Sequence, residues 1–139
     1  MKYRGRRVFG VLFNFNYSMK STAETGRYGE QVATNYLRQR GFMICDINWR
    51  QGRYEIDIVA QKGGITHFVE VKTRRVGSML SPEQTLNKSK LKAMHTAASI
   101  YLNQRRVVGE IEFDLLAVDI FPDDTCDVRF VPNVVEYGW

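Results

Sequence analysis

The sequence predicts one α/β domain in which helices flank a mixed central sheet, with the element order α-β-β-β-α-β-β. Three observations support this fold class. Two stretches, within 22–40 and 81–105, repeat apolar residues at the helical period of about 3.6. Five shorter stretches are rich in β-branched and aromatic residues and are bounded by turn-forming residues. A length of 139 residues suffices for a single core but not for two.

The first twenty residues form a basic and aromatic extension ahead of the predicted domain, which spans 21–139. This extension contains no acid and has no clear helical or strand period. We consider two interpretations. It is either a disordered or translation-start extension, with Met19 as an alternative start, or a segment that stacks on bases and neutralises phosphates. Its cationic residues are Lys2, Arg4, Arg6, Arg7 and Lys20.

The first helix is predicted over 22–40. The capping-box pattern S-T-A-E at 21–24 marks its start, and Gly41 marks its end. Its inward-facing residues are Val32, Ala33, Tyr36 and Leu37. Glu30 lies at the start of this apolar stripe, where an acid is unusual. A favourable contact with the helix dipole, worth only about 0.3–1 kcal/mol, would not require that face.

Five strand segments are predicted, and two of them form a hairpin. The first strand covers 42–49. The hairpin strands cover 54–60 and 67–73, joined by a polar turn with Gly63 and Gly64. A further strand covers 110–120 and ends at the turn F-P-D-D, 121–124. The chain then returns over 128–131 and 134–137 as a last strand or a hairpin, interrupted by Pro132.

The hairpin places acids and a lysine in otherwise apolar strands. Strand alternation puts Asp57 on one face with Glu55 and Val59, and Glu70 on one face with Phe68 and Lys72. The opposite face, with Ile56, Ile58, Val69 and Val71, is expected to be purely apolar.

Such a layout suits a site for Mg²⁺ or Mn²⁺, which take oxygen ligands. The carboxylates of Asp57 and Glu70 and the carbonyl of Val71 are the predicted ligands. Lys72 would orient or deprotonate a water beside the metal. The alternative is an ordinary ion pair between Glu70 and Lys72 on an exposed sheet surface.

Several motifs follow one another in a specific order. Glu30 comes first, then E-I-D-I at 55–58 and F-V-E-V-K-T-R at 68–74. Further matching positions are Gly29, Asn48, Arg50, Lys90, Ala97, Ala98, Tyr101, Leu102, Phe113 and Asp114. This pattern, over about 24–120, resembles the YraN family of uncharacterised bacterial proteins. That family is similar in fold to restriction-endonuclease-like PD-(D/E)XK nucleases and Holliday-junction resolvases. One departure is Tyr54, where the family usually has Gly.

The resemblance implies a restriction-endonuclease-like sandwich with a mixed central sheet. It also implies a nuclease-like catalytic quartet of Glu30, Asp57, Glu70 and Lys72, with Lys90 as a further polar position. Junction-cutting relatives of this fold are dimers, so a homodimer is a further expectation.

The second helix starts either at the S-P-E-Q pattern, 81–84, or at Asn87. Its apolar stripe consists of Leu91, Met94, Ala98, Tyr101 and Leu102. Lysines near its amino end interact unfavourably with the positive end of the helix dipole. They therefore indicate an anionic partner such as phosphate. The predicted nucleic-acid-binding residues are Arg74, Arg75, Lys88, Lys90 and Lys92.

Charge is divided unevenly along the chain. The net charge is +5, with eight basic residues and one acid over 72–106 and eight acids and one base over 107–139. The alternative to a nucleic-acid surface is a pair of solvated faces of opposite sign. His67 and His95 are predicted to be surface or half-buried residues rather than catalytic bases.

Composition excludes several other classes. Hydrophobic residues make up 44% and charged residues 25%, with only three prolines, which argues against extensive disorder. Cys45 and Cys126 lack the spacing of a zinc site or disulfide framework. No apolar run reaches the roughly 20 residues of a membrane span, and we expect no signal peptide. These observations favour a reduced, cytoplasmic location.

The sequence therefore predicts a nucleic-acid-binding protein with a divalent-metal site, acting as a structure-selective endonuclease. The expected partner is DNA, with RNA as the alternative. The rival interpretation is a non-catalytic nucleic-acid-binding or assembly module that retains the nuclease fold.

Overall fold

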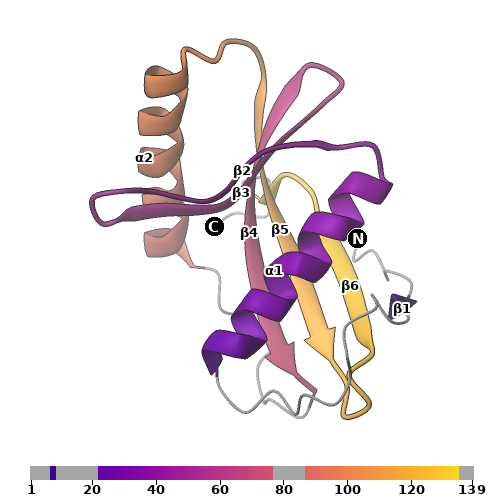
Figure 1. Ribbon diagram of the computed structural model, residues 1–139. Helices are drawn as coiled ribbons and strands as arrows, with labels where there is room; N and C mark the ends of the chain where they lie inside the picture. The colour runs from indigo at the N-terminus through magenta and orange to yellow at the C-terminus, as the bar shows by residue number, and fades with distance from the viewer. Residues whose placement is uncertain (1–6, 9–21, 77–86, 135–139) are drawn as a thin grey trace.

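Two helices and a six-stranded sheet make up the computed structural model, which describes residues 7–8, 22–76 and 87–134 (Figure 1). In chain order the elements are β1 (Arg7–Val8), α1 (Thr22–Gln39), β2 (Met43–Gln51), β3 (Tyr54–Lys62), β4 (Ile65–Arg75), α2 (Lys88–Arg105), β5 (Ile111–Ile120) and β6 (Cys126–Val131). The strands are ordered β1-β6-β5-β4-β3-β2. Only β4 and β5 pair in parallel; the other described pairs are antiparallel. The sheet is therefore mixed, as predicted.

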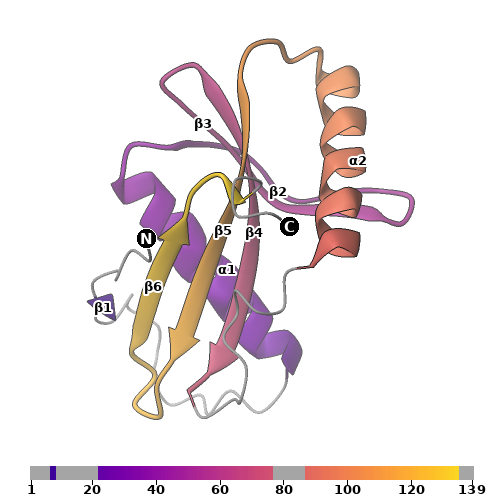
Figure 2. The same cartoon turned by 180° about the vertical axis from the view of Figure 1, so that it is seen from behind.

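The two helices cover opposite faces of the sheet, as Figure 1 and the reverse view in Figure 2 show. One buried cluster joins α1 to the sheet through Leu37, Ile58 and Val69. Another joins α2 to the opposite face through Leu91, Phe68 and Leu115. Because β4 and β5 are covered on both sides, β5 is buried along most of its length and β4 is buried from Thr66 to Glu70, as is usual for a parallel pair.

The strands β3 and β4 part halfway along their length. Their ladder runs from Lys62–Ile65 to Ile58–Val69 and stops there. Beyond that point β3 pairs with β2 alone, while β4 continues beside β5 to Arg75. Figure 1 shows the β2–β3 hairpin turning away from the sheet toward α2.

This parting corrects one prediction about the hairpin faces. Ile56 does not share a buried cluster with Ile58 and Val69. It packs with Trp49 on the α2 side, whereas Ile58 packs with α1. The sheet twists where β3 leaves β4, so strict alternation no longer assigns side chains to the same neighbours.

A close approach fixes α1 against β4. A Cβ atom added to Gly29 would lie 2.7 Å from the Cβ of Thr73, well inside van der Waals contact. Only glycine allows the helix backbone to lie this near the strand. The contact fixes how close the α1 backbone lies to β4 at the residue just before Glu30.

The predicted element order is confirmed from Thr22 onward, with boundaries shifted by a few residues. Of the predicted extension, Arg7–Val8 forms β1 and pairs with β6, and the rest lies outside the described residues. The second helix begins after Asn87, whose side-chain oxygen accepts a hydrogen bond from the Lys90 amide at 2.9 Å. The alternative start at 81–84 lies outside the described residues, as does the predicted return segment 134–137 except for Val134, which is not part of a strand. Among those described, no helix is long and apolar enough to span a membrane.

Candidate metal centre

Asp57 lies on β3 one residue beyond the last rung shared with β4. Its Oδ2 accepts a hydrogen bond from the Val71 backbone amide at 2.8 Å. The Asp57 side chain thus accepts the hydrogen bond that a neighbouring strand would accept if the β3–β4 ladder continued. Since the amide and carbonyl of one strand residue face the same edge, the Val71 carbonyl is directed to this side as well.

Glu70 is the central acid of the site, 5% exposed in the middle of the sheet. Its Oε1 lies 3.3 Å from the Nζ of Lys72 and 3.3 Å from the Nζ of Lys90. Lys72 follows on the same strand, and Lys90 comes from the first turn of α2. The amino end of an 18-residue helix, which favours anions, therefore faces the site.

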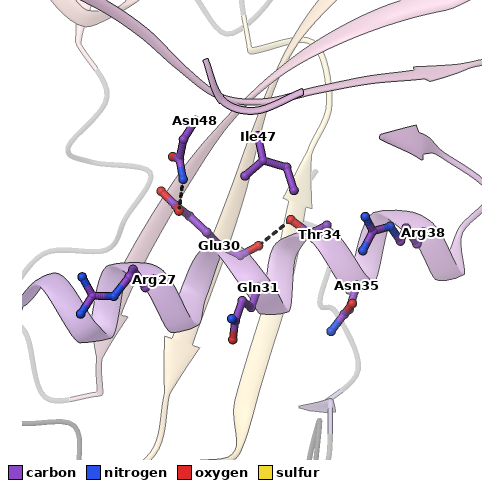
Figure 3. A pocket seen from close by; sticks show the side chains of 8 residues that line it. All are labelled: Arg27, Glu30, Gln31, Thr34, Asn35, Arg38, Ile47 and Asn48. Carbon is purple, nitrogen blue, oxygen red and sulfur yellow. Dashed lines mark hydrogen bonds between the residues drawn. The ribbon is translucent and has the colours of Figure 1, made fainter. Parts of the chain in front are cut away.

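Glu30 reaches the site from α1 with the help of Asn48. The Asn48 Nδ2 donates a hydrogen bond to Glu30 Oε2 at 2.9 Å (Figure 3). Asn48 lies between the pairs Ile47–Ile58 and Trp49–Ile56, which places it opposite Asp57 across the β2–β3 ladder. Its φ of 53° is left-handed, a conformation that asparagine adopts more readily than most residues.

Asp57 interacts electrostatically with Glu70, Glu30 and Lys90, so these groups form one site. Burial and the neighbouring Glu70 charge raise the pKa of Asp57 to about 7. The Val71 amide opposes this rise, and the Glu30 charge adds to it. Lys90 partly offsets the repulsion. Asp57 therefore remains partly protonated near neutral pH in the metal-free protein.

The donor set fits a hard divalent cation. Two carboxylates and a backbone carbonyl suit Mg²⁺ or Mn²⁺, which keep several waters and need few protein ligands. The oxygens of Glu30, Asp57 and Glu70 are not all within 4.8 Å of one another in the described structure. Asp57 and Glu70 are the predicted ligands, while Glu30 accepts a hydrogen bond from Asn48. We call Glu30, Asp57 and Glu70 the carboxylate site.

The predicted nucleic-acid-binding residues fall into two groups. Arg74 pairs with Asp119 at 2.8 Å and Arg75 with Asp124 at 3.8 Å, so acids of the later chain partly neutralise them. Lys88 and Lys92 are exposed on α2, while Lys90 belongs to the carboxylate site.

A second group, which we call the histidine cluster, consists of His67, Glu112 and Asp114. Its ligand atoms lie within 4.8 Å of one another, close enough to hold a metal ion. His67 Nδ1 is 2.6 Å from Asp114 Oδ2 and 3.1 Å from Glu112 Oε2. The other Asp114 oxygen accepts a hydrogen bond from the Asn133 amide at 2.9 Å.

The prediction that His67 is a surface or half-buried residue was wrong, because it is 7% exposed and lies between two acids. Burial disfavours the charged imidazolium, but the hydrogen bond and charge of Asp114, with Glu112, raise the pKa of His67 overall. His95 is exposed and packs its ring 4.3 Å from that of Phe113, as expected for a surface residue.

Sequence reasoning did not assign roles to Asn48, Glu112 or Asp114. An asparagine inside a strand and an acid inside an apolar strand are both unfavourable by propensity, and this was the available indication. Lys90 is predicted from the sequence as a polar and nucleic-acid-binding position, but its ion pair with Glu70 is not, because that pair depends on the packing of α2.

Comparison with known sequences gives a consistent result. Residues 29–118 match the family described as "Uncharacterised protein family UPF0102". A UPF0102 protein of Porphyromonas gingivalis is 36% identical over 103 residues, covering 74% of this chain and 76% of the relative. Another from Lawsonia intracellularis is 38% identical over 120 residues, covering 86% and 89%. A third from Dictyoglomus turgidum is 33% identical over 112 residues, covering 79% and 95%.

Proposed function

The chain belongs to the uncharacterised protein family UPF0102, and for it we propose metal-dependent hydrolysis of phosphodiester bonds in structured nucleic acid. The observation that carries the proposal is the geometry around Asp57 and Glu70. The half-buried Asp57 and the buried Glu70 are neighbours where two strands part, and two lysines contact Glu70. With Glu30 the group has three carboxylates and two lysines, a formal excess of one negative charge that a divalent cation would offset.

We also propose that the fold is of the restriction-endonuclease-like class. The element order from Thr22 and the mixed sheet with a helix on each face support this assignment. The carboxylate site lies where β3 leaves the sheet, between α1, which carries Glu30, and the amino end of α2, which carries Lys90.

The roles of the side chains follow from their contacts. A bound Mg²⁺ or Mn²⁺ would polarise the scissile phosphate and lower the pKa of a water. Lys72, partly exposed and 3.3 Å from Glu70, is placed to orient that water and take part in its deprotonation. Lys90 and the amino end of α2 would hold the phosphate charge. Asn48 positions Glu30 beside Asp57.

A cleavage assay tests the proposal. Branched, flapped and single-stranded DNA and structured RNA are incubated with Mg²⁺ or Mn²⁺ and the parent protein. We expect Glu70→Ala to abolish cleavage and Lys72→Ala to lower turnover on the order of a hundredfold with little loss of binding. Glu55→Gln and Lys62→Ala, on the same hairpin but outside the site, are the matched controls.

The alternative function is a nucleic-acid-binding module without catalysis. The exposed Lys88 and Lys92 beside the site favour it, because they serve binding whether or not cleavage occurs. A parent protein that binds in a salt-dependent manner but cuts no better than Glu70→Ala would support the module and refute the enzyme. A parent that neither binds nor cuts would refute both.

A further inference from the structure

A cleft of about 420 Å³ lies between α1 and β2, directly beside Glu30 (Figure 3). None of the contacts proposed above for catalysis uses it, apart from those of Glu30 and Asn48. We call it the α1 cleft; its lining residues are Arg27, Glu30, Gln31, Thr34, Asn35, Arg38, Ile47 and Asn48.

The helix supplies most of the lining through one polar stripe. Residues 27, 31, 34, 35 and 38 recur at intervals of three and four, so they share one side of α1. Arg27 and Arg38 stand at the two ends of the cleft, with Glu30 and Asn48 between them (Figure 3). Eleven residues of helix separate the arginines by roughly 16 Å.

The two arginines are available for a ligand. Within the part of the chain that the structure describes, neither Arg27 nor Arg38 has a carboxylate within ion-pair distance. The side-chain amides of Gln31 and Asn35 likewise have no hydrogen-bond partner among the described residues. Guanidinium and amide groups are the donors that phosphate and base edges accept.

The floor of the cleft carries one apolar side chain among otherwise polar lining residues. Ile47, on the edge strand β2, is 44% exposed although it is a large hydrophobic residue. A sugar or an unstacked base could cover it, whereas a duplex keeps its bases stacked inside. The floor therefore favours a single strand over a duplex.

The cleft adjoins the carboxylate site, with which it shares Glu30. Glu30 and Asn48 line it and also lie next to Asp57, so a strand with its scissile phosphate at Asp57 and Glu70 would pass into it. A span of roughly 16 Å accommodates about two to five nucleotides, depending on how far the strand is extended.

We propose that the α1 cleft binds the single-stranded segment of nucleic acid adjoining the scissile phosphate, with Arg27 and Arg38 on its phosphates and Ile47 against a sugar or base. This inference rests on the proposed function and specifies its substrate as one with a single-stranded arm. The shared ligand chemistry is a phosphodiester strand of either sugar type.

The test measures binding of a fluorescent single-stranded oligonucleotide across a salt series, with EDTA present to prevent cleavage. Parallel measurements with DNA and RNA oligonucleotides of the same sequence show which sugar type the protein binds. For the double variant Arg27→Gln, Arg38→Gln we expect at least a tenfold weaker affinity. The salt slope should fall by about 1.4, because each lost contact to a single strand removes about 0.7.

Two further variants make the result specific. Arg40→Gln, Lys62→Gln removes the same charge from exposed cations outside the α1 cleft and should bind as the parent does. Ile47→Ser should weaken binding severalfold without changing the salt slope, because the lost contact is not ionic. Thermal unfolding confirms that each variant folds.

The outcomes separate the two proposals. If the parent binds but the Arg27, Arg38 variant keeps its affinity and slope, the cleft inference is wrong and the proposed function stands. If the control variant loses as much as the cleft variant, net charge alone drives binding and the cleft inference is again wrong. A parent that binds neither oligonucleotide overturns the cleft inference, and the cleavage assay on branched and flapped substrates with Mg²⁺ or Mn²⁺ decides the proposed function separately.

Discussion

The protein holds two groups of acids, each with at least one buried carboxylate, that differ in how their charge is balanced. In the histidine cluster, the ring of His67 and the backbone amide of Asn133 satisfy both oxygens of Asp114. In the carboxylate site, Asp57 has one amide partner and two like charges nearby, and its pKa is raised to about 7. Both groups have ligands for a metal. Ligand spacing alone therefore does not distinguish a site whose charges the protein balances itself from a site where a cation would relieve repulsion.

The largest expected difference is in stability. Asp114→Asn should destabilise the protein by about 3–5 kcal/mol, because it removes the charge of the buried pair with His67. It also replaces one of the two acceptor oxygens, which face His67 and the Asn133 amide, with an NH2 donor. Glu70→Gln should leave the metal-free protein as stable as the parent or slightly more so, since it relieves repulsion with Asp57. Denaturant unfolding measures both. Equal losses in the two variants would remove the distinction between the clusters.

The next effect is stabilisation by metal. Mn²⁺ at about a hundred times its dissociation constant should raise the free energy of unfolding of the parent by about 2.7 kcal/mol. Asp57→Asn and Glu70→Gln should lose this gain, and Glu55→Gln should retain it. If both site variants keep the shift and His67→Gln loses it, the cation binds at the histidine cluster instead.

A smaller effect concerns pH. The folded pKa of Asp57, about 7, lies above its ordinary value of 3.8, so the metal-free parent should lose stability as pH rises between these values. Asp57→Asn should therefore stabilise the protein more at pH 8 than at pH 5, by roughly 1–2 kcal/mol. Unfolding curves of both proteins in EDTA give this difference. A constant effect of the substitution across this range would contradict the raised pKa.

The smallest effect is expected at His67. Its raised pKa means that its ion pair stabilises the fold fully below the ordinary pKa of 6.5, and that this contribution is lost as pH rises through the folded value. His67→Gln should thus cost about 0.5–1 kcal/mol more at pH 6 than at pH 9. His95→Gln, on the exposed side of α2, provides the control. The opposite pH trend would indicate a neutral buried imidazole.

Local pattern was sufficient to predict most of the fold. The alternation in 54–60 and 67–73, with Gly63 and Gly64 between them, predicted β3, β4 and their turn, and helix periodicity predicted α1 and the buried stripe of α2. The candidate site acids could be named because hydrophilic residues interrupt apolar strands. Their roles remain predictions until tested.

Long-range pairing explains what could not be predicted. His67 and Asp114 are 47 residues apart and meet only because β4 and β5 pair in parallel. Arg74 is likewise matched with Asp119 across the same pair of strands. The cluster in which Ile56 packs depends on where β3 separates from β4. The alternation of apolar residues in the sequence does not show that point. The α1 cleft could not be foreseen because β2 turns its edge toward the helix.

The hydrogen bond from the Val71 amide to Asp57 makes one backbone proton a reporter of the site. Val71 lies two residues beyond Val69, the last residue of β4 that pairs with β3. Protection of its amide from hydrogen exchange therefore depends on a titrating side chain rather than on a neighbouring strand. Protonation of Asp57, or its recruitment by a cation, would change the exchange rate and chemical shift of that single resonance. Spectroscopy of this amide could thus follow occupancy of the centre without any substrate.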